Sequence, residues 1–460
     1  MIFLLFGTGD YYQRYKKWFD SEKVAALLDN APEKQNTHID GIRVVSPDEG
    51  VRIPFDVIVI LSFYYSAMKQ QLLELGVEET RIYHFYDLHR FFRGRIIDVP
   101  IVVEDAAQKI LLLSQDLSLG GPAIALFHAA RLLKMNGYSV IYASMLEGPL
   151  RRKIEEAEIP VVVDENLQIG TMEDCSWTQG FALVVCNTVN FHVFLSKRDV
   201  DTPVVWWLHD AAFYYDGVDK ELLRRINRKN LQVVSVGPIP KRAIQTFLPD
   251  LKVGQLLYGV ADMCREGREH ISTEKVMFVT IGYVTEHKGQ DVLVQAVRML
   301  PEEYRKQAEF YLVGQDSTWL AQQLKQQAAD LDNVVFTGTV DRARIDRVLR
   351  EADVLVCPSR QDSMPTVAAE AMMHWVPCLL SDAVGTAQYI EDGAEGLLFA
   401  SEDVKALTER IKWCIDNREQ LLAMGRLARR IYEKTFSMEA FEEGILSLVE
   451  NMYCSRKEGN

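Results

Sequence analysis

The stretch Cys357-Pro-Ser-Arg-Gln-Asp-Ser-Met-Pro-Thr-Val-Ala-Ala-Glu-Ala-Met-Met373 decides the fold of this chain. The apolar run at 354–356 that precedes it is typical of a buried strand. A loop with two prolines follows, and the sequence predicts a helix from Thr366 onward. Backbone N–H groups and the positive end of the helix dipole converge at such a junction. The stretch therefore predicts a binding place for a phosphate group.

Two carboxylates flank this loop. Asp362 lies within it, and Glu370 lies in the predicted helix. Their oxygens can accept hydrogen bonds from hydroxyl groups on either side of a phosphate. Small and apolar residues surround Glu370, a setting that an exposed carboxylate does not need. We therefore interpret the loop as a nucleotide-sugar site.

The same order of strand, glycine-containing loop and helix occurs three times, beginning at residues 1–6, 109–113 and 276–281. Each copy is typical of the opening of a parallel α/β unit. A chain of 460 residues is long enough for two or three domains. The pattern predicts a Rossmann-like N-terminal domain, two larger α/β domains and a C-terminal helix with a tail, at 1–100, 105–263, 264–435 and 436–460.

Composition argues against several classes of protein. The formal net charge of -14 disfavours nucleic acid as a partner, because phosphate backbones select basic surfaces. The seven cysteines are scattered and lack the close pairing of a metal or redox motif. No apolar run approaches the roughly 20 residues that a membrane-spanning helix needs, and residues 1–6 are typical of a strand rather than a signal peptide. We expect a cytoplasmic protein. No Asp-x-Asp element suited to a metal–diphosphate bridge lies at a strand end, so no bound metal is expected.

The N-terminal segment carries part of a nucleotide-binding fingerprint. Gly7 and Gly9 follow its first strand, and Asp29 closes the second. Rossmann-type domains place such glycines against a phosphate and such an acid on a ribose hydroxyl. The third glycine of the fingerprint is Tyr12 here. The segment resembles the small N-terminal domain of nucleotide-sugar acyltransferases. Ligand binding and a scaffold or docking role are both open interpretations.

The second domain is expected to carry a rim of ligand-facing residues. The carboxyl ends of parallel strands meet at one edge of a sheet, where ligands bind. Gly120 and Gly121 follow one strand, Asn187 ends another and His209 follows the tryptophan-rich run at 204–208. Glycines there let the backbone approach a diphosphate, because no Cβ intervenes. We expect these four residues to share one edge.

These motifs, taken in order, resemble a GT-B glycosyltransferase of the retaining family 4, also called group 1. The likeness covers about residues 105–455 and rests on the glycine pair, His209, Tyr258-Gly-Val-Ala-Asp262, the loop from Gly282 to Gly289, Val335-Phe-Thr-Gly338 and the 357–373 stretch. It implies an α/β, GT-B fold: two doubly wound Rossmann-like domains facing a cleft, plus the small N-terminal Rossmann-like domain.

The resemblance also implies an activity. It is the transfer of a hexose from a nucleotide-diphosphate sugar to a growing cell-surface glycan or glycolipid, as in polysaccharide biosynthesis, with retention of anomeric configuration. It implies neither a protein nucleophile nor a general base, and no metal or cofactor. The rival interpretation is a catalytically silent GT-B protein that binds or chaperones another glycosyltransferase.

Residue roles follow from the same resemblance. Glu370 would bind the ribose, and Asp362 the hydroxyls of the donor sugar. His209 would contact that sugar near its 6-position, and Lys288 the diphosphate. The expected donor-binding residues are Gly120, Gly121, Gly282, Lys288, Ser363, Met364, Pro365, Thr366 and Glu370.

The chain departs from the family pattern at three places. Tyr283 stands where many members carry a second phosphate-binding arginine, and we hypothesise that Arg360 substitutes for it. Asp362 replaces a glutamate, and Ser363 and Pro365 replace two glycines. These changes predict that this chain prefers a different donor sugar from many members of the family.

A basic run at 220–229 lies in the second domain of this acidic chain. We expect it to form a helix. Such a helix can dock on anionic lipid headgroups at the inner face of a membrane. A solvated helix face is the alternative interpretation.

Overall fold

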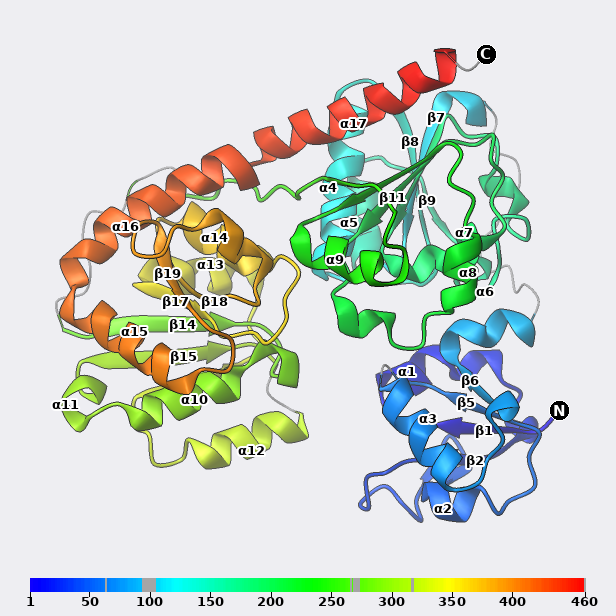
Figure 1. The fold of residues 1–460 in the computed structure, drawn as a ribbon, viewed down its shortest axis with the longest axis horizontal. Helices are drawn as coiled ribbons and strands as arrows, with labels where there is room; N and C mark the ends of the chain where they lie inside the picture. The colour runs from blue at the N-terminus through cyan, green and yellow to red at the C-terminus, as the bar shows by residue number, and fades with distance from the viewer. Residues whose placement is uncertain (63, 93–104, 265–266, 268–273, 316–317, 459–460) are drawn as a thin grey trace. The chain divides into compact units, whose positions relative to one another are not determined.

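The computed structural model describes residues 1–62, 64–92, 105–264, 267, 274–315 and 318–458 (Figure 1). These residues form three sheets of six, seven and six strands. The chain divides into two compact units. One holds residues 1–233 and 242–252, and the other holds 234–241 and 253–460.

The first sheet belongs to the N-terminal part of the chain. Its strands are β1 (Phe3–Phe6), β2 (Val24–Leu28), β3 (His38–Ile39), β4 (Ile42–Val45), β5 (Val57–Ile60) and β6 (Ile82–His84), with helices α1 (Asp10–Tyr15), α2 (Pro47–Gly50) and α3 (Tyr65–Glu74). The strand order is β3-β4-β2-β1-β5-β6. β1 and β5 are apolar and buried along their whole length, as expected for parallel strands covered on both faces.

The second sheet has the order β13-β12-β11-β10-β7-β8-β9. Its strands are β7 (Lys109–Ser114), β8 (Ser139–Ser144), β9 (Val161–Val163), β10 (Leu183–Asn187), β11 (Val204–Leu208), β12 (Leu231–Ser235) and β13 (Val253–Gln255). The helices between them are α4 (Gly121–Met135), α5 (Leu150–Glu156), α6 (Asn166–Ile169), α7 (His192–Ser196), α8 (Lys220–Arg225) and α9 (Pro238–Phe247). α4 ends at Met135, and Gly137, two residues later, has a φ of 85°, the left-handed conformation that commonly follows a helix end.

The third sheet has the order β16-β15-β14-β17-β18-β19 and is parallel throughout. Its strands are β14 (Val276–Ile281), β15 (Ala308–Val313), β16 (Val334–Gly338), β17 (Val354–Cys357), β18 (Cys378–Ser381) and β19 (Gly396–Phe399). The helices are α10 (Gln290–Met299), α11 (Glu302–Arg305), α12 (Trp319–Gln327), α13 (Arg342–Glu351), α14 (Thr366–Met373), α15 (Val404–Asp416), α16 (Arg418–Ile431) and α17 (Met438–Glu458).

The core of the third sheet is apolar and closely packed. Phe278 of β14 stacks on Phe310 of β15 with 4.9 Å between ring centroids, and both are fully buried. α10 and α15 pack against each other beside this sheet (Figure 1). Burying each phenylalanine stabilises the fold by about 1.5–3 kcal/mol. The core fixes the positions at which the strands end, and the loops begin there.

Strand order places a topological switch point in each large sheet. In the third sheet the chain moves outward from β14 through β15 to β16, then restarts with β17 on the other side of β14. In the second sheet it moves from β7 through β8 to β9, then restarts with β10. Open parallel sheets bind ligands beyond the carboxyl ends of such paired strands. The expected doubly wound α/β architecture is confirmed, and the exact domain limits stay predictions.

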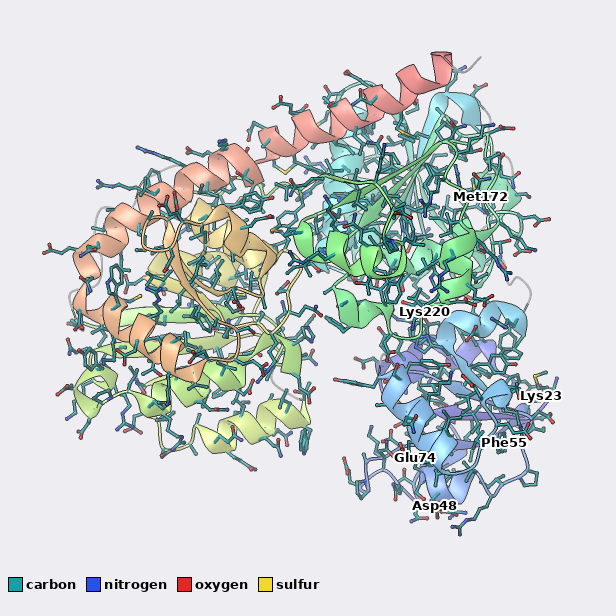
Figure 2. All side chains as sticks on the ribbon, in the orientation of Figure 1. Lys23, Asp48, Phe55, Glu74, Met172 and Lys220 are labelled. Carbon is teal, nitrogen blue, oxygen red and sulfur yellow. The ribbon has the colours of Figure 1, made fainter. Side chains whose placement is uncertain are left out.

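The expected basic helix at 220–229 is wrong in its second half. α8 begins at Lys220 (Figure 2), where the Asp219 side chain accepts from two backbone N–H groups, and it ends at Arg225. The chain then turns, and Asn230 has a φ of 51°, which a continuing helix does not allow. Arg228 and Lys229 therefore lie outside the helix. Among the described helices, none combines the length and apolar character needed to cross a bilayer.

Side chains connect the first two sheets within one compact unit. The Tyr86 hydroxyl donates to the Asn190 side chain, whose amide donates to Gln115 at the end of β7. Arg90 pairs with Asp219 at 3.1 Å. The N-terminal domain thus contacts Asn190 and Asp219 of the second domain, and Asn190 in turn contacts Gln115, just after β7.

Candidate active site

Lys288 and Asp362 meet at the switch point of the third sheet. Lys288 ends the short helical turn after β14, and Asp362 lies in the loop after β17. The Lys288 Nζ donates to Asp362 Oδ2 over 2.6 Å. The two side chains are 27% and 13% exposed, so the pair is partly shielded from water and can still meet a ligand. The structure thus brings together two residues that the sequence assigns to the donor.

Backbone contacts hold these loops against each other. The carbonyl of His287 accepts from Arg360 N at 2.8 Å, and the carbonyl of Asp362 accepts from Gly385 N at 2.9 Å. A Cβ on Gly289 would overlap the Pro358 carbonyl, and one on Gly385 would overlap the Ser363 carbonyl. Glycine is required at both places because the backbones approach so closely.

The helix start that follows this loop is α14. Pro365 is its N-cap residue, and the first helical residue is Thr366. Pro365 has no N–H group, so among the expected loop ligands only Ser363, Met364 and Thr366 can donate from the backbone. The Met364 side chain is buried, and its sulfur accepts from Thr386 at 3.3 Å. Any role of Met364 in binding would therefore use its backbone.

Glu370 lies one turn further along α14 and is engaged by a residue that sequence reasoning missed. Its side chain is 10% exposed and accepts from Arg342 Nη1 over 2.6 Å. Arg342 is the first residue of α13, and its own side chain is 58% exposed. One feature of the sequence could have pointed to Arg342. It is a cation at the start of a helix, where the helix dipole disfavours positive charge.

Arg360 does not have the role that we hypothesised. Its guanidinium binds both oxygens of Asp291, at 2.8 and 2.7 Å, and Glu402 at 2.9 Å. It also donates to the Glu286 carbonyl at 2.6 Å. The hydrogen bonds to Asp291 hold the pKa of Arg360 above its usual range. These partners are not the donor-site carboxylates, so the contacts of Arg360 do not support the hypothesis that it replaces the charge missing at Tyr283.

Tyr258 adds a buried hydroxyl to this region. The residue is 4% exposed, and its hydroxyl has no hydrogen-bond partner among the described residues. Its ring stacks on Phe436 with 6.1 Å between centroids. Burial raises the pKa of Tyr258, and the charges of Glu370 and Asp362 raise it further. Tyr258 thus keeps its proton, and its hydroxyl is close enough to Glu370 and Asp362 for their charges to affect its pKa.

Cys357, at the end of β17, is not a nucleophile at neutral pH. It is buried, and burial raises the pKa of its thiol to about 11. Nucleophilic cysteines react as thiolates with lowered pKa values. The described residues also contain no group of three or more His, Cys, Asp or Glu side chains that could hold a metal ion.

The expected rim of the second sheet is present at the ends of β7, β10 and β11. Asn187 pairs in register with Trp207, and its Nδ2 donates to the Pro122 carbonyl at 2.8 Å. Gly120 and Gly121 start α4 and are exposed. Gly120 has a φ of -74°, which any residue can adopt, so the turn itself does not demand glycine. A Cβ on Gly120 would lie 3.1 Å from the Ser118 hydroxyl, a tight contact.

His209 is neutral in this rim. Burial lowers its pKa to about 3, and its ring lies 4.6 Å from that of Trp207. Its Nε2 is buried and has no hydrogen-bond partner among the described residues. Burial raises the pKa of the neighbouring Asp210 to about 6, although Val189 N donates to it at 2.6 Å. A neutral imidazole can exchange a hydrogen bond with a sugar hydroxyl, and it adds no charge.

In the N-terminal domain, Asp29, the candidate ribose-binding residue, accepts hydrogen bonds from its own domain. The Asp29 side chain accepts from the N–H and hydroxyl of Thr8, from Ala31 N at 2.9 Å and from Lys34 at 3.3 Å. Burial acts to raise the pKa of Asp29, but the bonds from Thr8 and Ala31 and the charge of Lys34 outweigh it and hold the pKa low. At the third fingerprint position the buried Tyr12 fills the space that a glycine would leave.

Three parts of the chain match known protein families. Residues 266–431 match the family Glycosyl transferases group 1, and residues 106–235 match Glycosyl-transferase family 4. The chain carries group 1 and family 4 glycosyltransferase domains. The Lys288–Asp362 pair and the Arg342–Glu370 pair lie in the group 1 domain, and His209 lies in the family 4 domain. Residues 2–83 match C2185-like, N-terminal, an additional domain.

Individual relatives span different shares of the molecule. The chain is 25% identical to spore coat protein SA of Bacillus subtilis (strain 168) over 293 residues, 58% of this chain and 77% of that protein. It is 27% identical over 183 residues to the lipopolysaccharide glucosyltransferase WaaG of Escherichia coli (strain K12), 37% of this chain and 48% of WaaG. The match therefore spans about half the length of WaaG.

A solved structure of HepE from Anabaena, in complex with UDP and glucose, gives a TM-score of 0.62 at 20% identity. The match covers 75% of this chain and all of that one. At this level of identity the likeness concerns the fold. The group 1 and family 4 domains together have the GT-B fold, as the sequence predicts.

Proposed function

We propose that this protein transfers a hexose from a nucleotide-diphosphate sugar to a cell-surface glycan or glycolipid, with retention of configuration and without a metal ion or cofactor. The observation that carries the proposal is the Lys288–Asp362 contact of 2.6 Å beside the start of α14. A cation, a carboxylate and a helix N-terminus of this kind suit a diphosphate joined to a sugar.

The chemistry assigns a task to each group. Cleavage of the bond between the anomeric carbon and phosphate leaves negative charge on the departing diphosphate. Lys288 and the N–H groups at the start of α14 stabilise that charge. Asp362 accepts from hydroxyls of the donor sugar, and Glu370 accepts from the ribose. The neutral His209 hydrogen-bonds the sugar near its 6-position.

Relatives support the donor and acceptor classes. HepE was solved with UDP and glucose, and WaaG is named a lipopolysaccharide glucosyltransferase. A UDP-hexose is therefore the first donor to test. Contact with an anionic membrane at its cytoplasmic face remains part of the proposal. The cations left on α8 are Lys220, Arg224 and Arg225, and Arg225 pairs with Glu221 at 3.0 Å.

The experiment offers UDP-, GDP-, ADP- and dTDP-hexoses to the full chain, together with a crude acceptor fraction. We expect transfer from one donor, unchanged in EDTA, with the product linkage keeping the donor's anomeric configuration by NMR. Glu370→Gln should lower kcat/KM at least about 10-fold through the lost ribose contact. The matched control is Glu303→Gln, at an exposed glutamate of α11. Absence of turnover with all four donors would overturn the proposal.

A further inference from the structure

Arg342 occupies a position that helix physics does not favour. It is the first residue of α13, after the N-cap Asp341, whose side chain accepts from Arg344 N at 2.8 Å. The positive end of a helix dipole repels a cation there by about 0.3–1 kcal/mol. Local helix stability therefore does not explain an arginine at this position. The reason for an arginine at this position therefore has to be sought in the contacts of its guanidinium group.

The guanidinium contacts Glu370 through one N–H group, over 2.6 Å. Glu370 is its one recorded partner among the described residues. A guanidinium has five N–H donors, and a carboxylate accepts about four hydrogen bonds. The pair can thus persist while Glu370 accepts from ribose hydroxyls. Four donors of Arg342 then remain for another group.

Among the described residues of the group 1 domain, neither Tyr283 nor Arg360 supplies a second cation for the site. Tyr283 is uncharged, and Arg360 is held by Asp291 and Glu402. Lys288 is paired with Asp362. Lys288 and Arg342 are therefore the two cations recorded on the donor-site carboxylates.

Distance along α14 suggests which part of a nucleotide Arg342 meets. Thr366 begins the helix, and Glu370 lies four residues later, about 6 Å along the axis at 1.5 Å per residue. A nucleotide with its ribose at Glu370 and its terminal phosphate at the helix start has its first phosphate between them. Arg342 contacts Glu370 itself, and of the two phosphates the first is the one joined to the ribose, so we assign Arg342 to that first phosphate.

We propose that Arg342 is a nucleotide-binding residue that orients Glu370 for the ribose and binds the phosphate attached to that ribose. It supplies the positive charge that Tyr283 does not. The inference rests on the proposed function and adds to it a named second cation. It also explains the exposure of Arg342, since a side chain that meets a ligand has to remain accessible.

Calorimetric titration of the full chain with UDP, UMP and uridine tests this role. Arg342→Gln should weaken UDP and UMP binding about 10- to 100-fold, the loss expected for one charge-assisted hydrogen bond. Uridine binding should weaken less than UDP and UMP binding, because uridine loses only the orientation of Glu370 and has no phosphate contact to lose. Arg342→Lys should recover part of the UDP affinity. Arg344→Gln is the matched control, because this arginine is exposed on the same helix turn.

Other outcomes would overturn the inference. Equal UDP affinity in wild type and Arg342→Gln would show that the arginine has no contact with the nucleotide. Stronger binding of UDP and uridine alike would show that Arg342 merely blocks Glu370. Equal losses for all three ligands would show that the substitution disturbs Glu370 alone. If wild type binds none of UDP, GDP, ADP and dTDP, the proposed function fails first, before any variant is compared.

Discussion

Lys288 and Asp362 are 74 residues apart in the sequence, and their Nζ and Oδ2 atoms are 2.6 Å apart in the fold. Parallel strands bring them together, because β14 and β17 are neighbours and both end at the same edge of the sheet. Removing one of the two charges leaves the other partly buried and deprives it of this ion pair. Stability and donor chemistry are therefore linked at this pair.

A double-mutant cycle on the pair separates these two contributions. We expect Lys288→Met and Asp362→Asn each to lower the free energy of unfolding by about 1–2 kcal/mol, through the lost charge-assisted bond. The double variant should lose about 1 kcal/mol less than the two single losses combined. Urea unfolding measures these values. Turnover of the donor should fall at least about 100-fold in Lys288→Met, because the departing diphosphate loses its cation. Additive stability losses would contradict the coupling.

Arg360→Ala should affect stability and leave donor binding unchanged. Its guanidinium holds Asp291 and Glu402 and touches no donor-site carboxylate in the recorded contacts. Because the Arg360 and Asp291 side chains are 29% and 28% exposed, we expect a loss of about 1 kcal/mol. Thermal unfolding and UDP titration measure the two effects. Asp291→Asn serves as the partner control and should produce a similar loss. A weaker UDP affinity in Arg360→Ala would restore its role at the phosphates.

Tyr258→Phe removes a buried hydroxyl that has no protein partner in the described structure. Deleting such a group costs no hydrogen bond, so we expect the free energy of unfolding to stay within about 0.5 kcal/mol of wild type or to rise. The matched comparison is Tyr432→Phe, because that hydroxyl donates to the Val260 carbonyl at 2.8 Å. We expect Tyr432→Phe to lose about 1 kcal/mol. Equal losses in the two variants would reveal an unseen partner of Tyr258.

Acid should destabilise the fold partly through His84. This residue is fully buried, and burial lowers its pKa from the usual 6.5 to about 3. Between these values the unfolded chain binds the proton and the folded chain does not. The stability is therefore complete above pH 6.5 and falls as the pH decreases, by up to about 1.4 kcal/mol per pH unit. His209 acts in the same direction.

Urea unfolding at pH 6.5 and pH 5 measures this contribution. Wild type should lose about 1.6 kcal/mol more between the two pH values than His84→Gln does. His38→Gln, at an exposed histidine, should behave as wild type. Asp210 opposes the trend: its pKa is raised to about 6, so the stability it contributes is present below about pH 4 and is lost as the pH rises through 6. Identical pH dependence in His84→Gln and wild type would contradict the assignment.

The donor loop could be predicted from the sequence because its signals are local. A buried strand, a proline-rich loop and a small-residue helix fix the positions of Asp362 and Glu370, and parallel pairing then brings Lys288 near. The partners of the two arginines could not be predicted. Arg342 reaches Glu370 from a different helix, and Arg360 is held by carboxylates 69 and 42 residues away. Such contacts depend on how helices pack, which a single sequence does not encode locally.

The close approach of backbones around this loop limits how the enzyme could be redesigned. Gly289 and Gly385 have no room for a side chain, because carbonyls of the 358–363 segment occupy that space. Ser363 and Pro365 in the 363–366 segment, by contrast, already differ from the family pattern. A combinatorial library for new donor sugars should therefore randomise residues 363–366 together with Tyr283. Both glycines should stay fixed, since nearly every clone that changes them would be lost to misfolding before its specificity could be screened.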